Sequence, residues 1–371
     1  MPFAGIPPFC TQGSRKIMSE LRRTRQAIRQ LTNRAVLHSL WVSVVMCGVL
    51  LAGISIGETF IPWQHVIHTL ANRLFDTQYV VDALDAGIIW NYRLTRALVS
   101  ACCGACLAVS GVVLQSLLRN ALAEPYLLGI SAGASTGAVL IALTGLGAGI
   151  VSMSLGAFIG ALTAFLFVAL LAMAARGKHG SATTQIILAG IASSQLFNAI
   201  TSLIITRSAN AEQARGIMFW LLGNLSGVRW PDVVLAIPTA LVGIIICFCY
   251  ARHLDAFSFG AESAASLGIP VKRTRVVLIT AVTGMTAIMV SIVGAIGFVG
   301  LVIPHAARLL VGNQHHRLLP VSAFIGAIFL IVADVISRTL LPGQVLPIGV
   351  ITALVGAPAF SLILIRGNPS K

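Results

Sequence analysis

The chain has 371 residues, of which 57% are hydrophobic and only 10% are charged, and its mean hydropathy is +0.92. A soluble globular protein must present a substantially polar surface to water, so this composition excludes that class. The formal charge of +14 comes from basic residues dispersed among the loops, which argues against a nucleic-acid-binding face.

Residues 1–36 form a basic segment ahead of the first apolar run. The basic region is too long for a secretory signal, and no small-residue cleavage site convincingly follows the first span. An approximate apolar stripe between Ile17 and Ala35 is compatible with a helix lying on an anionic membrane leaflet. A flexible basic leader that only helps to orient the chain is the other interpretation. In either case we expect a cytoplasmic N-terminal extension.

Apolar runs of roughly the length that crosses a bilayer recur along the rest of the chain. Each is expected to be a helix, because a helix satisfies its own backbone hydrogen bonds in lipid. The sequence therefore predicts an all-α polytopic membrane protein with about ten transmembrane helices, at 37–57, 94–117, 127–145, 152–175, 185–206, 232–250, 276–293, 297–312, 318–337 and 347–366. The boundary around Gly294–Gly297 fits either a tight turn or a broken helix.

The distribution of Lys and Arg orients these spans. An even number of spans puts both termini on one side of the membrane. With the N-terminus inside, most of the 25 basic residues fall on the cytoplasmic side, as the positive-inside rule requires. We therefore expect a multi-pass protein of the bacterial inner membrane with a transmembrane domain over 37–366. The loop 251–275 and the tail 367–371 are then cytoplasmic.

Small residues recur at helical spacing in two adjacent spans. Gly129, Gly133 and Gly137 lie four residues apart in the third span, and Gly156 and Gly160 repeat the spacing in the fourth. Glycines at this spacing let two helix backbones approach closely, so the pattern predicts helix packing.

The seven cysteines lie mostly inside the spans, as in the run from Cys102 to Cys106. Buried cysteine behaves as a small hydrophobic residue, and the sequence has no paired CxxC set. We therefore expect no metal site and no bound cofactor on this chain.

The sequence also bears on the source of energy. It contains no GxxxxGK[ST] phosphate loop, and Asp334 is the only acid that we place inside a span. A secondary transporter driven by protons or sodium ions usually needs buried ionisable groups along its path. A transporter of this composition therefore needs a separate motor subunit, whereas a channel or secondary transporter remains the contrasting class.

The loop 251–275 contains a predicted short helix from about Phe259 to Leu267. Ser258 is the expected N-cap, and Glu262 is favourably placed near the positive end of the helix. Gly268 suits the left-handed position after the helix, and Pro270 prevents its continuation.

Two further sets of polar residues are candidate functional residues, and the first is a group of three arginines. Arg93 and Arg96 share one helix face at the outer mouth of the second span, and Arg338 follows Asp334 at the outer end of the ninth. Exposed positive charge there would steer an acidic partner. The alternatives are arginines that anchor span ends, and a pair between Arg338 and Asp334.

The fifth span carries several amides and hydroxyls that share one helical side. Polar groups in lipid need water or a partner, so this side predicts either a channel lining or inter-helix hydrogen bonds. The residues concerned are Gln195, Asn198, Thr201 and Ser202.

Four motifs, which follow one another along the chain, connect this sequence to a known family. They are RLTRALVSACCGACLAVSGVVLQSLLRNALAEPYLLGISAGASTG, FSFGAESAASLGIP, GAIGFVGLVIPHAARL and LPIGVITALVGAPAF. Over roughly residues 37–366 the chain resembles the FecCD/BtuC-type permeases of bacterial ABC importers for ferric siderophores, heme and cobalamin. Thr95 departs from the pattern, since many members have proline there.

The resemblance implies the type II ABC importer permease fold, working as a homodimer with two ATPase subunits and a periplasmic binding protein. ATP and magnesium would then bind only to the partner ATPase. Ferric siderophore is the leading expected substrate, with heme or cobalamin as the alternative.

The resemblance also implies roles for individual residues. Arg93, Arg96 and Arg338 would receive glutamates of the binding protein. The span with Gln195 and Asn198 would lie beside the central channel of the dimer. The loop 251–275 would form the coupling helices that contact the ATPase, through Gly260, Glu262, Ala265, Leu267 and Gly268.

Overall fold

The computed structural model describes residues 40–59, 61–144, 152–175, 182–208 and 210–366. The chain divides into two units, Met1–Val49 and Leu50–Lys371. In the first unit the described residues, 40–49, begin the helix Leu40–Ser55. The basic extension 1–36 and the tail 367–371 lie outside the described residues.

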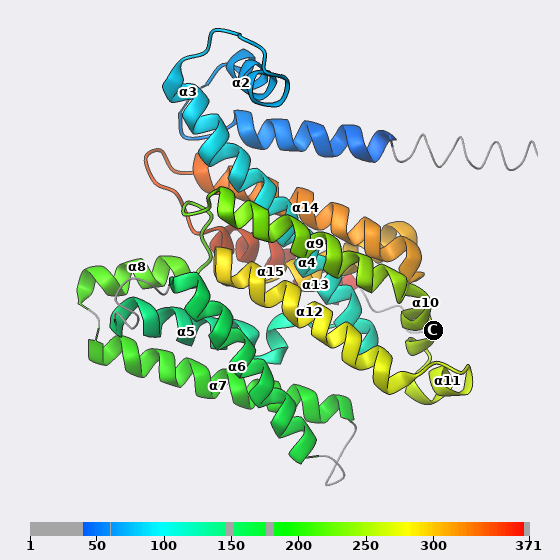
Figure 1. Ribbon diagram of the computed structural model, residues 1–371. Helices are drawn as coiled ribbons and strands as arrows, with labels where there is room; N and C mark the ends of the chain where they lie inside the picture. Colours follow the sequence, from blue (N-terminus) through cyan, green and yellow to red (C-terminus); the bar gives the residue numbers. More distant parts are fainter. Residues whose placement is uncertain (1–39, 60, 145–151, 176–181, 209, 367–371) are drawn as a thin grey trace, which may run out of the picture. The chain divides into compact units, whose positions relative to one another are not determined.

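The described part of the second unit is helical (Figure 1). Its elements in chain order are α2 (Trp63–Phe75), α3 (Ala83–Ile88), η1 (Ile89–Arg93), α4 (Leu94–Leu117), η2 (Pro125–Leu128), α5 (Ile130–Thr144), α6 (Met153–Ala174), α7 (Ala182–Ser208), α8 (Ala211–Leu221), α9 (Trp230–Cys249), α10 (Ala251–Phe257), α11 (Ala261–Ser266), α12 (Val271–Val293), α13 (Val299–Val311), α14 (His315–Thr339) and α15 (Ile348–Arg366). Within the described ranges, the extended pairing is limited to an isolated bridge between Leu341 and Gln344.

The predicted spans are confirmed as helices. Six helices among the described residues are long and apolar enough to cross a membrane, and four shorter apolar helices account for the remaining predicted spans. The short ones are Leu40–Ser55, Ile130–Thr144, Val299–Val311 and Ile348–Leu362. The second span is longer than predicted, because α3 and the π-helical turn η1 continue directly into α4 to give a 35-residue helix, Ala83–Leu117.

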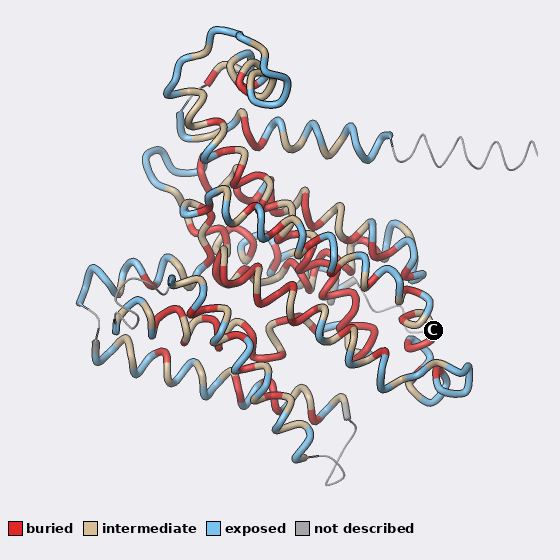
Figure 2. The backbone as a smooth tube through the Cα atoms, in the orientation of Figure 1, coloured by how far each residue is buried: buried red, intermediate tan, exposed pale blue. Residues whose placement is uncertain are grey.

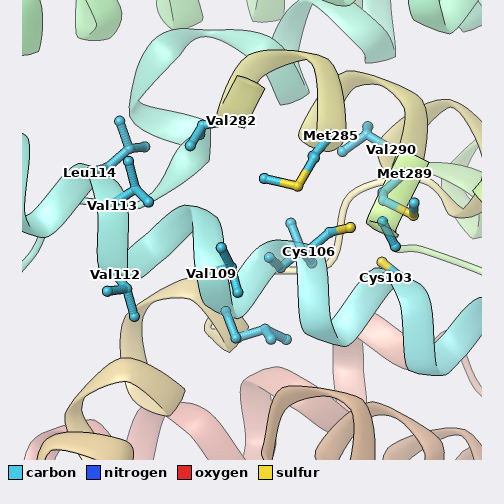
Figure 3. Close-up of a cluster of buried hydrophobic side chains, with 14 of the residues drawn as sticks. Cys103, Cys106, Val109, Val112, Val113, Leu114, Val282, Met285, Met289 and Val290 are labelled. Carbon is cyan, nitrogen blue, oxygen red and sulfur yellow. The ribbon is translucent and has the colours of Figure 1, made fainter. Parts of the chain in front are cut away.

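The helix α4 forms the centre of the second unit (Figure 2). It packs against α9, α12, α13 and α14, and 83% of its most apolar stretch is buried. Cys103 and Cys106 lie in this core beside Met285 and Met289 of α12 (Figure 3). These two cysteines therefore fill space as small apolar side chains, as predicted.

The helices α5, α6 and α7 pack on one another as a group. A Cβ atom added at Gly137 would overlap the carbonyl oxygen of Gly156, and one at Gly133 would overlap that of Gly160. The glycine spacing therefore marks the contact between α5 and α6, as predicted.

The connection between α12 and α13 covers residues 294–298, which have no regular helix. Tyr126 fixes it from η2, since its hydroxyl donates to the carbonyl of Ile296 at 2.9 Å and accepts from the Ile296 amide at 2.8 Å. Phe298 has a left-handed backbone with φ of 68° immediately before α13 begins. The seventh and eighth spans are thus separate helices joined by a pinned, irregular segment.

Candidate functional site

Arg93, Arg96 and Arg338 meet at one end of the paired helices α4 and α14. Arg93 ends η1, Arg96 lies in the first turn of α4, and Arg338 lies in the last turn of α14. Their exposed fractions are only 4%, 7% and 4%. The expectation that these arginines are exposed is therefore wrong, because neighbouring groups of the chain surround them.

Asp334 is the centre of this arginine cluster. Its carboxylate is 1% exposed. Oδ1 lies 2.7 Å from Nη2 of Arg96 and accepts a second hydrogen bond from Nε at 3.3 Å, while Oδ2 lies 3.0 Å from Nη2 of Arg338. The alternative interpretation that Asp334 pairs with Arg338 is thus confirmed, and the pair with Arg96 adds to it. One carboxylate holds two guanidinium groups in place.

Arg93 has a different set of partners. Its Nη1 donates to the carbonyl oxygens of Ile54 at 3.2 Å and Ser55 at 2.7 Å, and its Nη2 donates to the backbone and side-chain oxygens of Thr59. Arginine suits the C-terminal carbonyl groups of a helix, and here it caps the end of Leu40–Ser55. Arg93 therefore fixes the segment that borders the cluster.

A cavity of about 360 Å³ opens onto the three arginines. Its other lining residues are Gly57, Glu58, Thr59, Ile88 and Tyr92. Its lining contains three guanidinium groups and one carboxylate, that of Glu58, so positive charge is in excess there, and Asp334 pairs with Arg96 and Arg338 behind the lining. The cavity is therefore suited to one additional carboxylate, which could accept charge-assisted hydrogen bonds from guanidinium groups already held in position.

The opposite end of α4 adjoins the short helices α10 and α11. The predicted loop helix is present but shorter than expected, since α11 covers Ala261–Ser266 and α10 precedes it. Ser258 is not its N-cap, because this residue ends α10 and its hydroxyl donates to the carbonyl of Leu254 at 3.3 Å. Gly260 takes the N-cap position with φ of 110°, and Gly268 has the predicted left-handed backbone with φ of 80°.

The surface of α11 is open. Glu262 lies in its first turn, and Glu262, Ala265, Leu267 and Gly268 are exposed, whereas Gly260 is buried. Sequence reasoning missed Phe259, whose exposed fraction of 76% is similar to the 71% of Leu267. Both are large apolar side chains exposed outside the spanning helices, and an aromatic residue in a loop is the signal that could have indicated Phe259.

The polar residues of α7 do not form one site. Gln195, Asn198 and Ser202 are exposed in the second unit, whereas Thr201 is buried. Thr201 lies 2.8 Å from the hydroxyl of Thr136 in α5, so it forms the inter-helix hydrogen bond that was one of the two expectations. The other three residues remain available to a channel or to a second copy. Among the residues that the structure describes, no three His, Cys, Asp or Glu side chains gather as a metal site.

Comparisons with known proteins agree with this architecture. The model of the FecCD transport family matches residues 44–366. The cobalamin import system permease protein BtuC of Halobacterium salinarum is 40% identical over 304 residues, which cover 82% of this chain and 79% of that protein. The Fe(3+) dicitrate transport system permease protein FecD of Escherichia coli is 32% identical over 328 residues, which cover 88% of this chain and 98% of that one.

A solved structure supports the same assignment at the level of fold. It is described as an inward-facing metal-chelate type ABC transporter, and it matches with a TM-score of 0.76 and 28% sequence identity, covering 88% of this chain and 98% of that chain. The helices of this chain therefore adopt the type II importer fold, and the chain belongs to the FecCD transport family of ABC transporter permeases.

Proposed function

We propose that this chain is the permease subunit of a bacterial ABC importer that carries a ferric siderophore across the inner membrane. It works as a homodimer with two cytoplasmic ATPase subunits and one periplasmic binding protein. The observation that supports the proposal is that two distinct features lie at opposite ends of α4. One is the arginine-lined cavity and the other is the exposed surface of α11 with its flanking residues Phe259 and Leu267.

The arginine cavity is the docking site for the binding protein. Its excess positive charge attracts an acidic partner, and the buried pairs with Asp334 fix where a partner carboxylate can bind. Because Arg96 and Arg338 are buried, the partner must insert its carboxylate into the cavity, where Tyr92 forms part of the lining.

The surface of α10 and α11 is the docking site for the ATPase. Phe259 and Leu267 are large apolar side chains that a partner can cover, and Gly260 sets the sharp turn between the two short helices. ATP and magnesium bind to the ATPase chain. In this orientation α10, α11 and both termini are cytoplasmic, as the distribution of basic residues indicates.

The substrate is an iron chelate in this proposal, and ferric siderophore is its leading form. The relative named for Fe(3+) dicitrate transport supports an iron chelate. Cobalamin is the second candidate, since a relative of higher identity is named for cobalamin import, and heme stays within the same class of large chelates. Gln195, Asn198 and Ser202 line the path where two copies of α7 approach each other.

A secondary transporter is the contrasting class. Asp334 is the acid that such a mechanism would use inside a span, but two arginines hold its carboxylate at 2.7 and 3.0 Å. A carboxylate held between two guanidinium groups is placed as their structural counter-charge. The cluster therefore favours docking over ion transport.

Copurification tests the proposed assembly. The tagged chain is extracted from its native membrane in mild detergent, and native mass spectrometry reports its partners and stoichiometry. Two copies of the chain with two copies of an ATPase are expected. The double variant Phe259→Asp, Leu267→Asp should lose the ATPase, because charged side chains would have to be buried at the interface.

Leu84→Asp is the matched control for this experiment. Leu84 is 75% exposed on α3, so the change has the same chemistry and similar exposure at the other end of α4. This variant should retain the ATPase. A chain that purifies without an ATPase, or a double variant that keeps it at the wild-type stoichiometry, would contradict the assembly.

A further inference from the structure

The helices α4 and α14 form an antiparallel pair with direct contacts at both ends and in the middle. Arg96 and Asp334 join them at the arginine cluster. Halfway along, a Cβ atom at Gly104 would overlap the carbonyl oxygen of Gly326, so the two backbones are in direct contact. Small residues at such a contact allow close packing of the two helices.

The far end of the pair is joined by His315, the first residue of α14. His315 is 2% exposed. Its Nε2 lies 2.6 Å from Oγ of Ser116 in the last turn of α4, and its Nδ1 lies 2.7 Å from Oδ1 of Asp255 in α10. The backbone amide of His315 also donates to this carboxylate oxygen at 2.9 Å, so Asp255 caps α14 from another helix.

The joint holds in either protonation state of the imidazole. A neutral ring with its proton on Nδ1 donates to Asp255 and accepts at Nε2 from the Ser116 hydroxyl. A doubly protonated ring donates to both residues, and the Ser116 hydroxyl then donates to the carbonyl of Val112, 3.0 Å away. Both arrangements connect α10 to α4 through His315.

The residue next to Ser116 extends the same connection to α13. Gln115 accepts from Nη1 of Arg308 at 2.6 Å and donates to the carbonyl of Gly300 at 3.2 Å. The last turn of α4 is therefore fastened to α10, α13 and α14 by side chains of two consecutive residues. The other end of α4 has the arginine cluster, about 30 Å away at 1.5 Å per residue.

Ser116, His315 and Asp255 have the side chains of a hydrolase triad, but their surroundings oppose that chemistry. Ser116 lies at the C-terminal end of a helix, where the free backbone groups are carbonyl oxygens and the helix dipole is negative. A developing oxyanion needs N–H donors and positive potential. The geometry is therefore that of a structural joint.

We propose that His315 is the positioning residue through which movement of α10 and α11 is transmitted to the α4–α14 pair, and along it to the arginine cluster. The inference rests on the proposed function, in which α10 and α11 contact the ATPase. When the ATPase displaces α10, Asp255 moves the N-terminus of α14, and Ser116 moves with it. The packed pair then shifts as a unit, because its middle and its far end are fastened as well.

The test separates the joint from the stability of the fold. His315→Asn keeps a side-chain amide near the position of Nδ1, so contact with Asp255 is retained while the link to Ser116 is lost. Ser116→Ala breaks that link from the other side and leaves the pair of His315 with Asp255 intact. His316→Gln is the matched control, because His316 is the exposed neighbour in the same turn.

The complex that copurifies with each variant is reconstituted in liposomes, and the periplasmic binding protein is supplied on the side of the arginine cavity. ATP hydrolysis and uptake are measured with labelled ferric hydroxamate, ferric citrate, heme and cobalamin. The number of ATP molecules hydrolysed per chelate taken up is then calculated for the chelate that is transported. We expect the ATP hydrolysed per chelate to rise at least about threefold in His315→Asn and in Ser116→Ala, with no further rise in the double variant. His316→Gln should keep the wild-type ratio.

Three outcomes are distinguishable. Wild-type complex that shows no ATP-dependent uptake of any of the four chelates overturns the proposed function. Wild-type complex that transports, with both variants keeping its ratio, overturns the role of His315. A fall of hydrolysis and uptake in the same proportion also overturns it, because loss of folded protein lowers both and leaves the ratio unchanged.

Discussion

Asp334 explains how two arginines can be buried side by side at the end of α4 and α14. Its two oxygens contact Arg96 and Arg338, and Arg338 also donates to the carbonyl of Gly53 at 2.9 Å. Burying an unpaired guanidinium would cost several kcal/mol, whereas a shared carboxylate offsets this cost. In the proposed docking site, Asp334 therefore fixes the shape of the cluster without needing to touch the partner.

Removing this carboxylate tests its structural role. Asp334→Asn leaves two buried guanidinium groups without their counter-charge, so we expect the free energy of unfolding to fall by about 3–5 kcal/mol. Chemical denaturation in detergent micelles measures the change. Asp82→Asn, at an exposed position, should change it by no more than about 0.5 kcal/mol. An equally small effect of Asp334→Asn would show that Asp334 does not support the arginines.

Sequence reasoning found part of this site. The spacing of Asp334 and Arg338 indicated a pair one helical turn apart, which the structure contains. The contact between Arg96 and Asp334 joins residues 238 positions apart, and no local pattern predicts it. The joint at His315 was missed for the same reason, since its partners come from two other helices. Exposure of the arginines was overestimated because their partners were unknown.

The contact between α5 and α6 shows how single glycines set helix packing. Gly133 and Gly137 face Gly160 and Gly156 with no side chain between the backbones. This packing depends on backbone contact and van der Waals attraction, because lipid provides no hydrophobic drive for two apolar helices to associate.

A single methyl group tests this contact. Gly137→Ala places a Cβ atom against the carbonyl of Gly156, so the helices must separate, at a cost of about 1–3 kcal/mol in unfolding free energy. Gly284→Ala in α12 is the control, because the added Cβ atom has no neighbour within 4 Å. It should be neutral or stabilise the protein by up to about 1 kcal/mol. Equal effects of the two variants in thermal unfolding would contradict close packing at Gly137.

The spans were predictable as elements because hydropathy and length alone identify apolar helices. The short helices α2 and α8 were less predictable. They are not apolar enough to span a membrane, so hydropathy and length do not distinguish them from loops. The start of α11 was misplaced because Ser258 is a good N-cap by type but is occupied at the end of α10. Capping preferences predict that a helix begins nearby, and tertiary contacts select the residue.

At the scale of the whole molecule, the long helix Ala83–Leu117 connects the two proposed docking surfaces. Arg96 lies in the first turn of its α4 part and Ser116 in the last turn, and α14 runs beside α4 between these residues. A transporter of this kind needs each partner to influence the other across the membrane. The fastened pair of helices gives a direct physical route for that influence.

Charge at the rim of the arginine cavity tests the docking surface. Tyr92→Glu adds a negative charge that offsets the excess positive charge, so affinity for the binding protein should fall by about tenfold or more. Val80→Glu is the control, since Val80 is 95% exposed and does not line the cavity. Surface plasmon resonance at low ionic strength compares the two. Equal affinities would place the docking surface elsewhere.

The most direct test of the whole account is uptake by a strain that lacks this chain and any redundant importers. Labelled ferric siderophores, heme and cobalamin are supplied in turn, with and without depletion of ATP while the ion gradients are maintained. The account predicts that restoring the chain restores uptake of a chelate, with ferric siderophore first, and that ATP depletion abolishes it. Uptake that persists without ATP, or no restored uptake of any chelate, would contradict it.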